Sequence, residues 1–232
     1  AVFDTAFHRT MLPEASHYAI PQEWVSKLGI KRYGFHGLSH AYCASQAATL
    51  LNRPAENLKV IICHLGHGCS VSAVRGGRCM DTTMGFTPLE GLMMATRSGS
   101  IDAGAVLHIL RHANLSPDEV STALNKRSGL LGVSGVSADM REVLASADEG
   151  NKQASLAIDM FCYRVRQAIG AYFVTLGGAD ALVFTAGIGE NSPQIRKRIC
   201  NGLEVLGFSL DDGKNQAIST DGEISETQSL RR

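Results

Sequence analysis

The sequence predicts an α/β domain built on a mixed β-sheet, with residues 1–232 in a single domain. An apolar run over 58–63 is followed by hairpin strands around a glycine turn at 75–77. Residues 152–176 show the apolar spacing of a long amphipathic helix, and a strand at 181–186 leads into a helix at 193–206. Hairpin strands followed by alternating helices and strands are typical of this fold class.

The first fifty residues are expected to be irregular apart from one helix. Residues 1–7 are interpreted as the end of a strand that carries Asp4 in an otherwise apolar setting, and residues 8–34 as a loop with short turns. Ser39 is expected to cap a helix over about 40–52, because a serine oxygen can accept a hydrogen bond from a free N–H group of the first turn.

The middle of the chain combines a hairpin, a long loop and two helices. The hairpin strands are predicted at 69–74 and 78–82, and the glycine- and methionine-rich residues 83–101 are expected to form loops. A short helix at 102–112 precedes a helix over 116–126, which opens on a Ser-Pro-Asp-Glu capping box.

The following helices carry a clearer core pattern. Ser137 is expected to begin a helix that ends near Ala147. The next helix, at 152–176, should bury one face, because its apolar residues recur every three or four positions: Ala154, Ile158, Phe161, Val165, Ile169 and Phe173.

Composition argues against several classes of function. Lys plus Arg and Asp plus Glu both number 22, so the chain lacks the positive charge typical of proteins that bind nucleic acid or anionic membranes. No apolar run is long enough to span a membrane, and no signal peptide is visible. The cysteines show neither CxxC pairs nor metal-ligand spacing, which favours reduced thiols and a cytoplasmic protein: Cys43, Cys63, Cys69, Cys79, Cys162 and Cys200.

The ends of the sequence suggest part of a longer protein. The chain opens on Ala1, directly in the strand-like segment AVFDTAF, and it closes on the polar segment SETQSLRR. We therefore expect these residues to be one piece of a larger chain.

Three loops have the composition of a nucleotide site. Residues 182–193 contain an apolar strand, two glycines and a helix start in a row, where free N–H groups and the helix dipole favour an anion. Gly187 and Gly189 are expected to form a tight turn, although a purely structural strand-to-helix turn fits the same pattern. Residues 64–68 follow another apolar run and residues 139–141 follow a Gly- and Ser-rich run, so the loops predict a nucleotide cleft at one sheet edge.

Asp4, His36 and Arg97 are candidate catalytic residues, each with an ordinary alternative. A carboxylate among apolar residues is costly unless it caps a turn, pairs with a charge or binds a cation, and an isolated histidine is commonly structural. Arg97 lies in a glycine-flanked loop and could present its planar guanidinium to a phosphate or carboxylate, whereas a surface salt bridge is the commoner role. His64 and His67 have no third ligand at a suggestive spacing, so a histidine metal site is not favoured.

Seven motifs follow one another along the chain: FDTAFH, RYGFHGLSH, HLGHG, DTTMGFTPLEGL, TRSGSID, SADMRE and GIGENSPQIR. With these motifs the sequence resembles the acetate kinase family, the acetokinases, which include propionate kinases. The resemblance is collinear from Val2 to about Leu210, and motifs of this length in this order are far more specific than a Gly-x-Gly turn alone.

The resemblance implies a ribonuclease-H-like domain of the actin-like, sugar-kinase-like ATPase superfamily, with a mixed five-stranded sheet and helices on both faces. The family transfers the γ-phosphoryl group of ATP, with Mg²⁺, to a short-chain carboxylate, and it also forms ATP from ADP and the acyl phosphate. Its members dimerise through the nucleotide-binding domain, so a homodimer is expected. The Met-rich stretch 80–94 is a candidate contact surface, although methionines more commonly fill gaps in a core.

The resemblance also implies roles for individual residues. Asp4 resembles an aspartate associated with Mg²⁺ or phosphoryl transfer, and His36 and Arg97 resemble the pair that stabilises the transferring phosphoryl group and orients the carboxylate. Such chemistry requires positioning and charge neutralisation rather than a covalent group on the protein. The implied phosphate loop is His64, Leu65, Gly66, His67 and Gly68; the ribose and adenine loop is Asp139, Met140 and Arg141; and the adenosine loop is Gly187, Ile188, Gly189, Glu190 and Asn191, with Ile188 and Ile195 as apolar plates around the base.

The sequence departs from the family pattern in several places. His67 stands where the family has an asparagine, Ala95 where glycine is common, and Ser100 where aspartate is common. The family's amino-terminal domain, with its own phosphate loop, and its carboxy-terminal glutamate have no counterpart in these residues. We therefore expect the isolated chain to bind nucleotide weakly and to show no phosphoryl transfer, because half of the phosphate clamp is missing.

Two other functions share most of these features. A propionate kinase would carry the same motifs, because the acyl pocket lies partly outside this chain. A regulatory or assembly module of the same superfamily would need the adenosine loops but not the trio of Asp4, His36 and Arg97.

Overall fold

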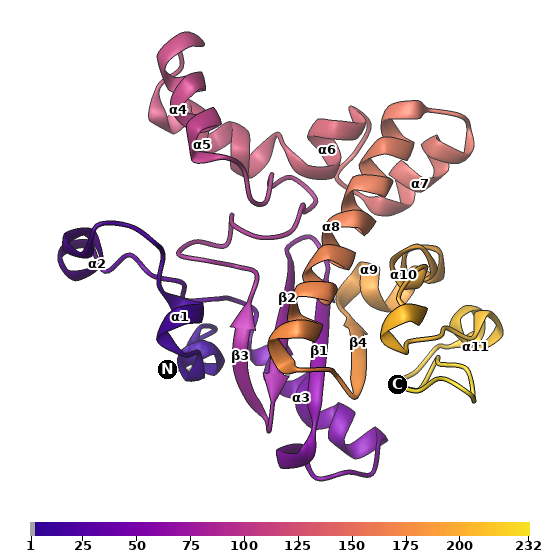
Figure 1. Cartoon of the computed structure of the whole chain (residues 1–232). Coiled ribbons are helices and arrows are strands. Elements are labelled where there is room, and N and C mark those ends of the chain that lie inside the picture. Colours follow the sequence, from indigo (N-terminus) through magenta and orange to yellow (C-terminus); the bar gives the residue numbers. More distant parts are fainter. Residues whose placement is uncertain (1–2) are drawn as a thin grey trace.

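The computed structural model describes residues 3–232, which are built around a four-stranded mixed sheet with the order β3-β2-β1-β4 (Figure 1). Strand β1 (Lys59–Leu65) pairs antiparallel with β2 (Cys69–Arg75) and parallel with β4 (Ala181–Thr185). Strand β2 also pairs antiparallel with β3 (Arg78–Thr82). Because β1 and β4 run in the same direction, the chain leaves both of them at one edge of the sheet.

Helices and short 3₁₀ turns (η) make up most of the remaining described chain. They are η1 (Ala6–Thr10), α1 (Pro13–Ser16), α2 (Gln22–Leu28), α3 (Gly37–Leu50), η2 (Ala55–Asn57), α4 (Ala103–His112), α5 (Pro117–Lys126), α6 (Gly129–Ser134), α7 (Met140–Asp148), α8 (Lys152–Leu176), α9 (Ala186–Asn191), α10 (Pro193–Cys200), η3 (Glu204–Leu206) and α11 (Asp212–Ala217).

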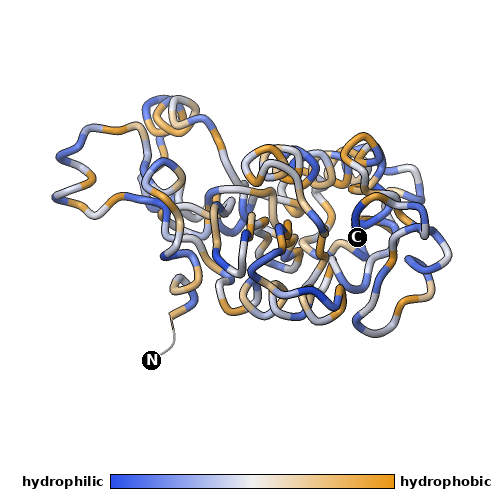
Figure 2. Tube along the Cα trace, turned by 60° about the horizontal axis from the view of Figure 1, so that its bottom comes forward, coloured by the Kyte–Doolittle hydropathy of each residue, from blue (hydrophilic) through white to orange (hydrophobic). Residues whose placement is uncertain are grey.

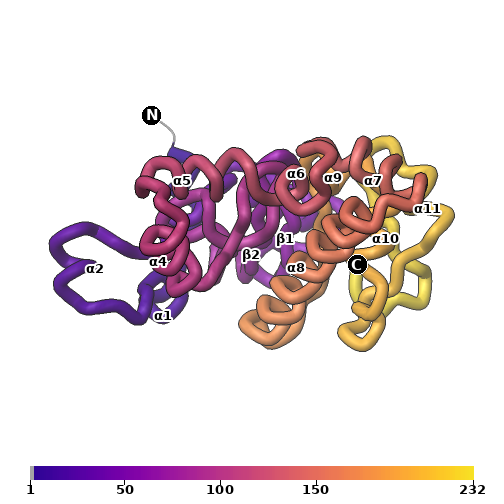
Figure 3. Tube along the Cα trace, turned by 90° about the horizontal axis from the view of Figure 1, so that it is seen from above, coloured from indigo at the N-terminus to yellow at the C-terminus, as the bar shows by residue number. Residues whose placement is uncertain are grey.

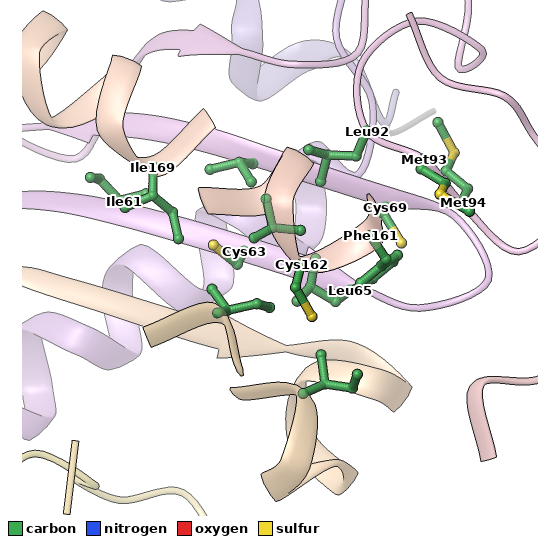
Figure 4. Close-up of a cluster of buried hydrophobic side chains, with 14 of the residues drawn as sticks. Ile61, Cys63, Leu65, Cys69, Leu92, Met93, Met94, Phe161, Cys162 and Ile169 are labelled. Atoms are coloured by element: carbon green, nitrogen blue, oxygen red, sulfur yellow. The ribbon is translucent and has the colours of Figure 1, made fainter. Parts of the chain in front are cut away.

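The long helix α8 covers one face of the sheet. Its fully buried residues Phe161 and Ile169 belong to the same core cluster as Ile61 and Leu65 of β1 (Figure 4). Three methionines of the Met-rich stretch, at positions 84, 93 and 94, are buried in this cluster as well. Core filling is therefore their observed role.

Helix α3 covers the opposite face. Its Cys43 and Ala47 cluster with Val60 and Ile62 of β1, and Figure 1 shows α3 behind the sheet with α8 in front. Successive β1 residues thus point alternately to the two helices, as the pleat of a strand requires. The prediction of helices on both faces is confirmed.

The predicted fifth strand is absent from the described residues, so the expectation of a five-stranded sheet was wrong. Residues 1–2 lie outside the description, and residues 3–7 form a turn and the start of η1 rather than a strand. The backbone carbonyl of Asp4 accepts a hydrogen bond from Gly37 N–H at 2.9 Å. This segment therefore contacts the start of α3, and the η1 turn that follows it bonds to the edge strand β3, where Thr10 Oγ1 donates to Cys79 O at 2.8 Å.

Several local predictions also need correction. The expected loop at 8–34 contains α1 and α2, and the helix assigned a Ser39 cap begins at Gly37 instead. The Ser39 hydroxyl bonds to His64 Nδ1 at 2.8 Å, so it is engaged across the fold rather than by its own helix. The helix expected to start at Ser137 begins at Met140.

The periphery is less closely packed on the sheet. The segment around α2 projects from the body in Figures 1 and 3, and Figure 2 shows hydrophobic positions along it. Trp24 and Leu28 of α2 have exposed side chains. Among residues 3–232, no helix is long and apolar enough to cross a membrane.

Candidate active site

Asp4 holds the amino terminus of α3. Its Oδ2 accepts a hydrogen bond from His36 N–H at 2.7 Å, and its Oδ1 accepts a longer one from Leu38 N–H at 3.5 Å. A Cβ atom at Gly37 would lie 2.1 Å from the Asp4 carbonyl oxygen, so only glycine permits this approach. The capping interpretation of Asp4 is confirmed, and its exposed carboxylate keeps further lone pairs free.

The side chains of His36 and Arg97 meet over Gly68. A Cβ atom built on Gly68 would lie 3.1 Å from His36 Nε2 and 3.4 Å from Arg97 Nη1. The His36 ring also stacks on that of His64, with 4.1 Å between the ring centroids. Candidate residues that are far apart in the sequence therefore share one site beside the loop 64–68.

Arg97 is anchored by backbone contacts around it. Its Nη1 donates to Pro88 O at 3.0 Å, and Ala95 N–H donates to His67 O at 3.2 Å. The second bond ties the arginine loop to the loop 64–68. The guanidinium therefore keeps several N–H donors for a ligand while its position is fixed.

The loop 64–68 also meets the start of α9. Parallel pairing aligns His64 with Thr185, and a Cβ atom on Gly66 would lie 3.4 Å from Ala186 Cβ. Ala186 has φ of 64°, so the sharp bend occurs at an alanine and not at the two glycines that follow it. Glu190 Oε1 stabilises this bend by accepting from Ala186 N–H at 2.9 Å. The tight glycine turn predicted at 187–189 was wrong, because these residues lie in helix α9.

The third predicted loop lies at the amino terminus of α7. Asp139 caps this helix by accepting from Arg141 N–H at 2.9 Å, and its carboxylate also pairs with the Arg141 guanidinium. Asp139 is therefore a helix cap, and the Arg141 guanidinium is its exposed partner. Within residues 3–232, no hydrogen bond joins residues 139–141 to the other two loops.

Comparison with known proteins shows the family to which the chain belongs. The sequence model of the acetokinase family matches residues 1–231. The chain belongs to the acetokinase family. It is 54% identical over 232 residues to the acetate kinase of Microcystis aeruginosa and 55% identical over 216 residues to that of Treponema denticola. These alignments cover 100% and 93% of the chain but 58% and 54% of the two relatives.

Solved structures show the same relationship. The acetate kinase of Porphyromonas gingivalis matches 99% of the chain with a TM-score of 0.97 at 40% identity, and the propionate kinase of Francisella tularensis matches 98% with 0.93 at 46%. The match covers 58% of each of those chains. This acetokinase chain therefore has their actin-like ATPase fold, with a four-stranded mixed sheet over the described residues, and it spans about three fifths of the length of its relatives.

Three residues assigned to the acetokinase nucleotide loops have side chains inside the core. Leu65 and Ile195 are completely buried, and Met140 is 3% exposed. Any contact these residues make with a nucleotide must therefore run through their backbone. Ile188 is only partly buried, so its side chain is more accessible to a purine base.

Three buried polar residues near the candidate site were not selected from the sequence: Arg196, Ser70 and His40. Arg196 is 3% exposed and donates to Gly189 O at 3.0 Å, which fixes the end of α9. Ser70 and His40 are both completely buried and bond to each other at 2.7 Å. Arg196 and His40 lie inside the motifs GIGENSPQIR and GFHGLSH, but only the fold shows what their side chains contact.

Burial lowers the pKa of three histidines at this site, which favours their neutral form. Loss of hydration lowers the pKa of His36 to about 4, an effect that the neighbouring His64 increases and Asp4 opposes. Complete burial lowers the pKa of His40 well below its usual value. Burial also lowers the pKa of His64, against the opposing charges of Asp4 and Glu190.

These shifts predict that acid destabilises the fold. Below pH 6.5 the unfolded chain protonates His36, His40 and His64, whereas the folded chain resists their protonation. The unfolded state then binds more protons, so the free energy of unfolding decreases as the pH is lowered. Each such histidine contributes up to about 1.4 kcal/mol per pH unit, so His36 and His40 alone should give a slope of at least about 2 kcal/mol per unit between pH 6 and 5. Urea unfolding at several pH values measures this slope.

Matched variants assign the slope to the buried rings. His40→Gln removes a buried histidine and should flatten the pH dependence, whereas His108→Gln changes an exposed ring of α4 and should leave it intact. Equal slopes for His40→Gln and the unmodified chain would contradict the assignment.

Proposed function

We propose that this chain supplies the nucleotide-binding half and part of the catalytic centre of an enzyme that transfers the γ-phosphoryl group of ATP to a short-chain carboxylate, reversibly. The observation that carries the proposal is the convergence of His36 and Arg97 over Gly68, next to Asp4. Here the guanidinium of Arg97 and the Nε2 atom of His36 both face the backbone of Gly68. Because glycine has no side chain, residue 68 does not block the approach of a phosphoryl group to either of them.

The residues would act by positioning and charge. The Arg97 guanidinium would bind equatorial oxygens of the transferring group, and its planar array of donors suits their geometry. The ring of His36, whose pKa is lowered to about 4 by burial, stays neutral and adds no net charge at neutral pH. The N–H groups of the loop 64–68 would contact the phosphates of the nucleotide, and no covalent intermediate on the protein is required.

Asp4 would hold Mg²⁺ bound with the nucleotide. Mg²⁺ in phosphoryl-transfer sites is commonly held by one or two carboxylates, with substrate phosphates and waters completing its coordination. Asp4 fits this description because its carboxylate is exposed and already oriented by the backbone of α3. When bound, the ion neutralises negative charge on the phosphates.

Around the nucleotide we propose three contact regions. The loop 64–68 would bind phosphate, residues 139–141 the ribose and adenine edge, and residues 187–191 with Ile188 the base. The meeting of Gly66 with Ala186 supports a common site for the first and third regions. The open space beside Gly187, where an added Cβ would meet no atom within 4 Å, supports a ligand-accessible surface on α9.

The proposed nucleotide site is tested by measuring how tightly the chain binds a fluorescent, non-hydrolysable ATP analogue in the presence of Mg²⁺. Gly187→Leu should weaken binding at least tenfold, or about 1.4 kcal/mol, because its side chain would fill the space proposed for adenosine. Arg97→Ala should leave the affinity nearly unchanged, because it is proposed to act on the transferring group.

Gly170→Leu provides the matched control. Gly170 is also a helical glycine with nothing within 4 Å of an added Cβ, but it lies in α8. It should preserve binding and helix content. Unchanged affinity in a folded Gly187→Leu chain would remove the adenosine site from α9.

Acetate or propionate is the proposed acceptor, because the relatives named above are acetate and propionate kinases. We further propose a single domain, a homodimer and a cytoplasmic location, the last because six buried free cysteines are typical of a reducing compartment. The trio of Asp4, His36 and Arg97 favours an enzyme over a regulatory nucleotide-binding module. The isolated chain is still expected to form no acyl phosphate.

A further inference from the structure

Ser70 links the rings of His36 and His40. Its hydroxyl lies on β2, completely buried, 2.9 Å from His36 Nδ1 and 2.7 Å from His40 Nε2. Within residues 3–232, these two ring nitrogens are its hydrogen-bond partners. The three groups therefore form a short buried chain that ends at the candidate active site.

Counting protons restricts this chain to two arrangements. A serine hydroxyl has one hydrogen to donate, and a neutral imidazole has one N–H and one bare nitrogen. If both rings donated to Ser70, its own buried hydrogen would have no acceptor. If neither donated, one bare nitrogen would face an oxygen lone pair. One ring must therefore donate to Ser70 and the other must accept from it.

The second nitrogen of His40 selects between these arrangements. His40 Nδ1 is buried without a hydrogen-bond partner among the described residues. If His40 accepted from Ser70, its proton would lie on Nδ1 as a buried N–H without an acceptor, which native proteins rarely contain. If His40 donates through Nε2, the unpartnered Nδ1 is only a bare lone pair, which is the less costly defect.

We infer that His40 and Ser70 are positioning residues that fix the tautomer of His36, with the hydrogen bonds running from His40 Nε2–H to Ser70 Oγ and from Ser70 O–H to His36 Nδ1. The proton of His36 then lies on Nε2, the nitrogen that faces Gly68 and Arg97. This inference deepens the proposed function and rests on it for its purpose. In that setting His36 presents an N–H donor to a phosphoryl oxygen, whereas the other tautomer would present a lone pair to the same oxygen.

The test is histidine ¹⁵N NMR of residues 1–232 without nucleotide, at a pH where the rings are neutral. His36 signals are assigned by their loss in His36→Gln. The expected result is an Nε2 signal at the position of a protonated nitrogen and an Nδ1 signal at the position of a bare, hydrogen-bond-accepting nitrogen. A protonated Nδ1 on His36 in the unmodified chain would overturn the inference by itself.

Variants distinguish the proposed hydrogen-bond relay, from His40 through Ser70 to His36, from an effect of side-chain packing alone. Ser70→Ala should abolish the fixed tautomer and move both His36 signals toward the average of the two forms. Ser72→Ala is the matched control, because Ser72 is an equally buried hydroxyl on β2 that bonds to Thr82 at 2.9 Å instead, and it should leave His36 unchanged. His40→Gln keeps an N–H donor toward Ser70 and should preserve the tautomer, whereas His40→Leu should lose it.

The outcome is independent of catalysis. If the chain shows the predicted tautomer but does not bind the ATP analogue, the proposed function is contradicted and the relay is still supported. If the chain binds nucleotide normally but the His36 signals are identical in Ser70→Ala and Ser72→Ala, the relay alone is contradicted.

Discussion

Replacing Arg97 by alanine is expected to lower kcat for phosphoryl transfer by roughly 10³-fold, in a catalytically competent protein that contains these residues. A loss of this size corresponds to about 4 kcal/mol of transition-state stabilisation. The physical reason is that the Arg97 guanidinium lies beside Gly68 and His36, anchored through Pro88 O, where charge on the transferring group develops. The affinity for ATP should change little, since the ground-state nucleotide has other contacts. Steady-state acyl phosphate formation, with kcat and KM measured separately, tests this.

Two further variants sharpen that result. Arg97→Lys keeps the charge but loses the planar array of donors, so it should recover only part of the activity. Arg127→Ala removes an exposed arginine that lines a different cavity with Arg32 and Asp81, and it should retain nearly full activity. A decrease of less than tenfold for Arg97→Ala would show that this guanidinium does not act on the transferring group.

Replacing Arg196 by alanine is expected to destabilise the fold by about 3–5 kcal/mol, because several neutral acceptors lose hydrogen bonds from a buried charged donor. Arg196 donates to the carbonyl oxygens of Gly189 and Glu190, and it also donates to the side chain and backbone of Asn215. Its removal would leave these acceptors unsatisfied in a buried environment. The carboxyl end of α9 would lose its support, so nucleotide affinity should fall together with stability.

Arg198→Ala is the matched control for this prediction. Arg198 lies on the same helix but forms an exposed pair with Asp159 at 3.2 Å, and such pairs contribute at most about 1 kcal/mol. Urea denaturation of both variants, with binding of the ATP analogue, separates the two roles. Similar small losses of stability in the two variants would show that the buried guanidinium is not needed to hold α9.

The local sequence pattern was sufficient to predict much of the fold. The helix predicted at 152–176 is α8 with the same bounds, the hairpin occurs at the predicted glycine turn, and the capping box of Ser116 and Glu119 is present. Each of these features depends on residues within a few positions of one another. Where a side chain was used over a longer distance, as with Ser39 and His64, the local interpretation was wrong.

The candidate site shows the same division. The motifs alone indicated the acetokinase family and selected Asp4, His36 and Arg97, because the order of motifs along a chain can be recognised from the sequence without a structure. They could not show that a bend at Ala186 replaces a glycine turn, since a φ of 64° at that residue is imposed by its surroundings.

The sequence by itself therefore determined the α/β class, the major helices and the family. Only the tertiary structure decided that the side chains of His36 and Arg97 meet over Gly68, and that Ser70 lies between two histidines. The physical reason is that periodicity and capping act along the chain, whereas contacts between distant residues depend on strand register and on which faces of the sheet the helices bury.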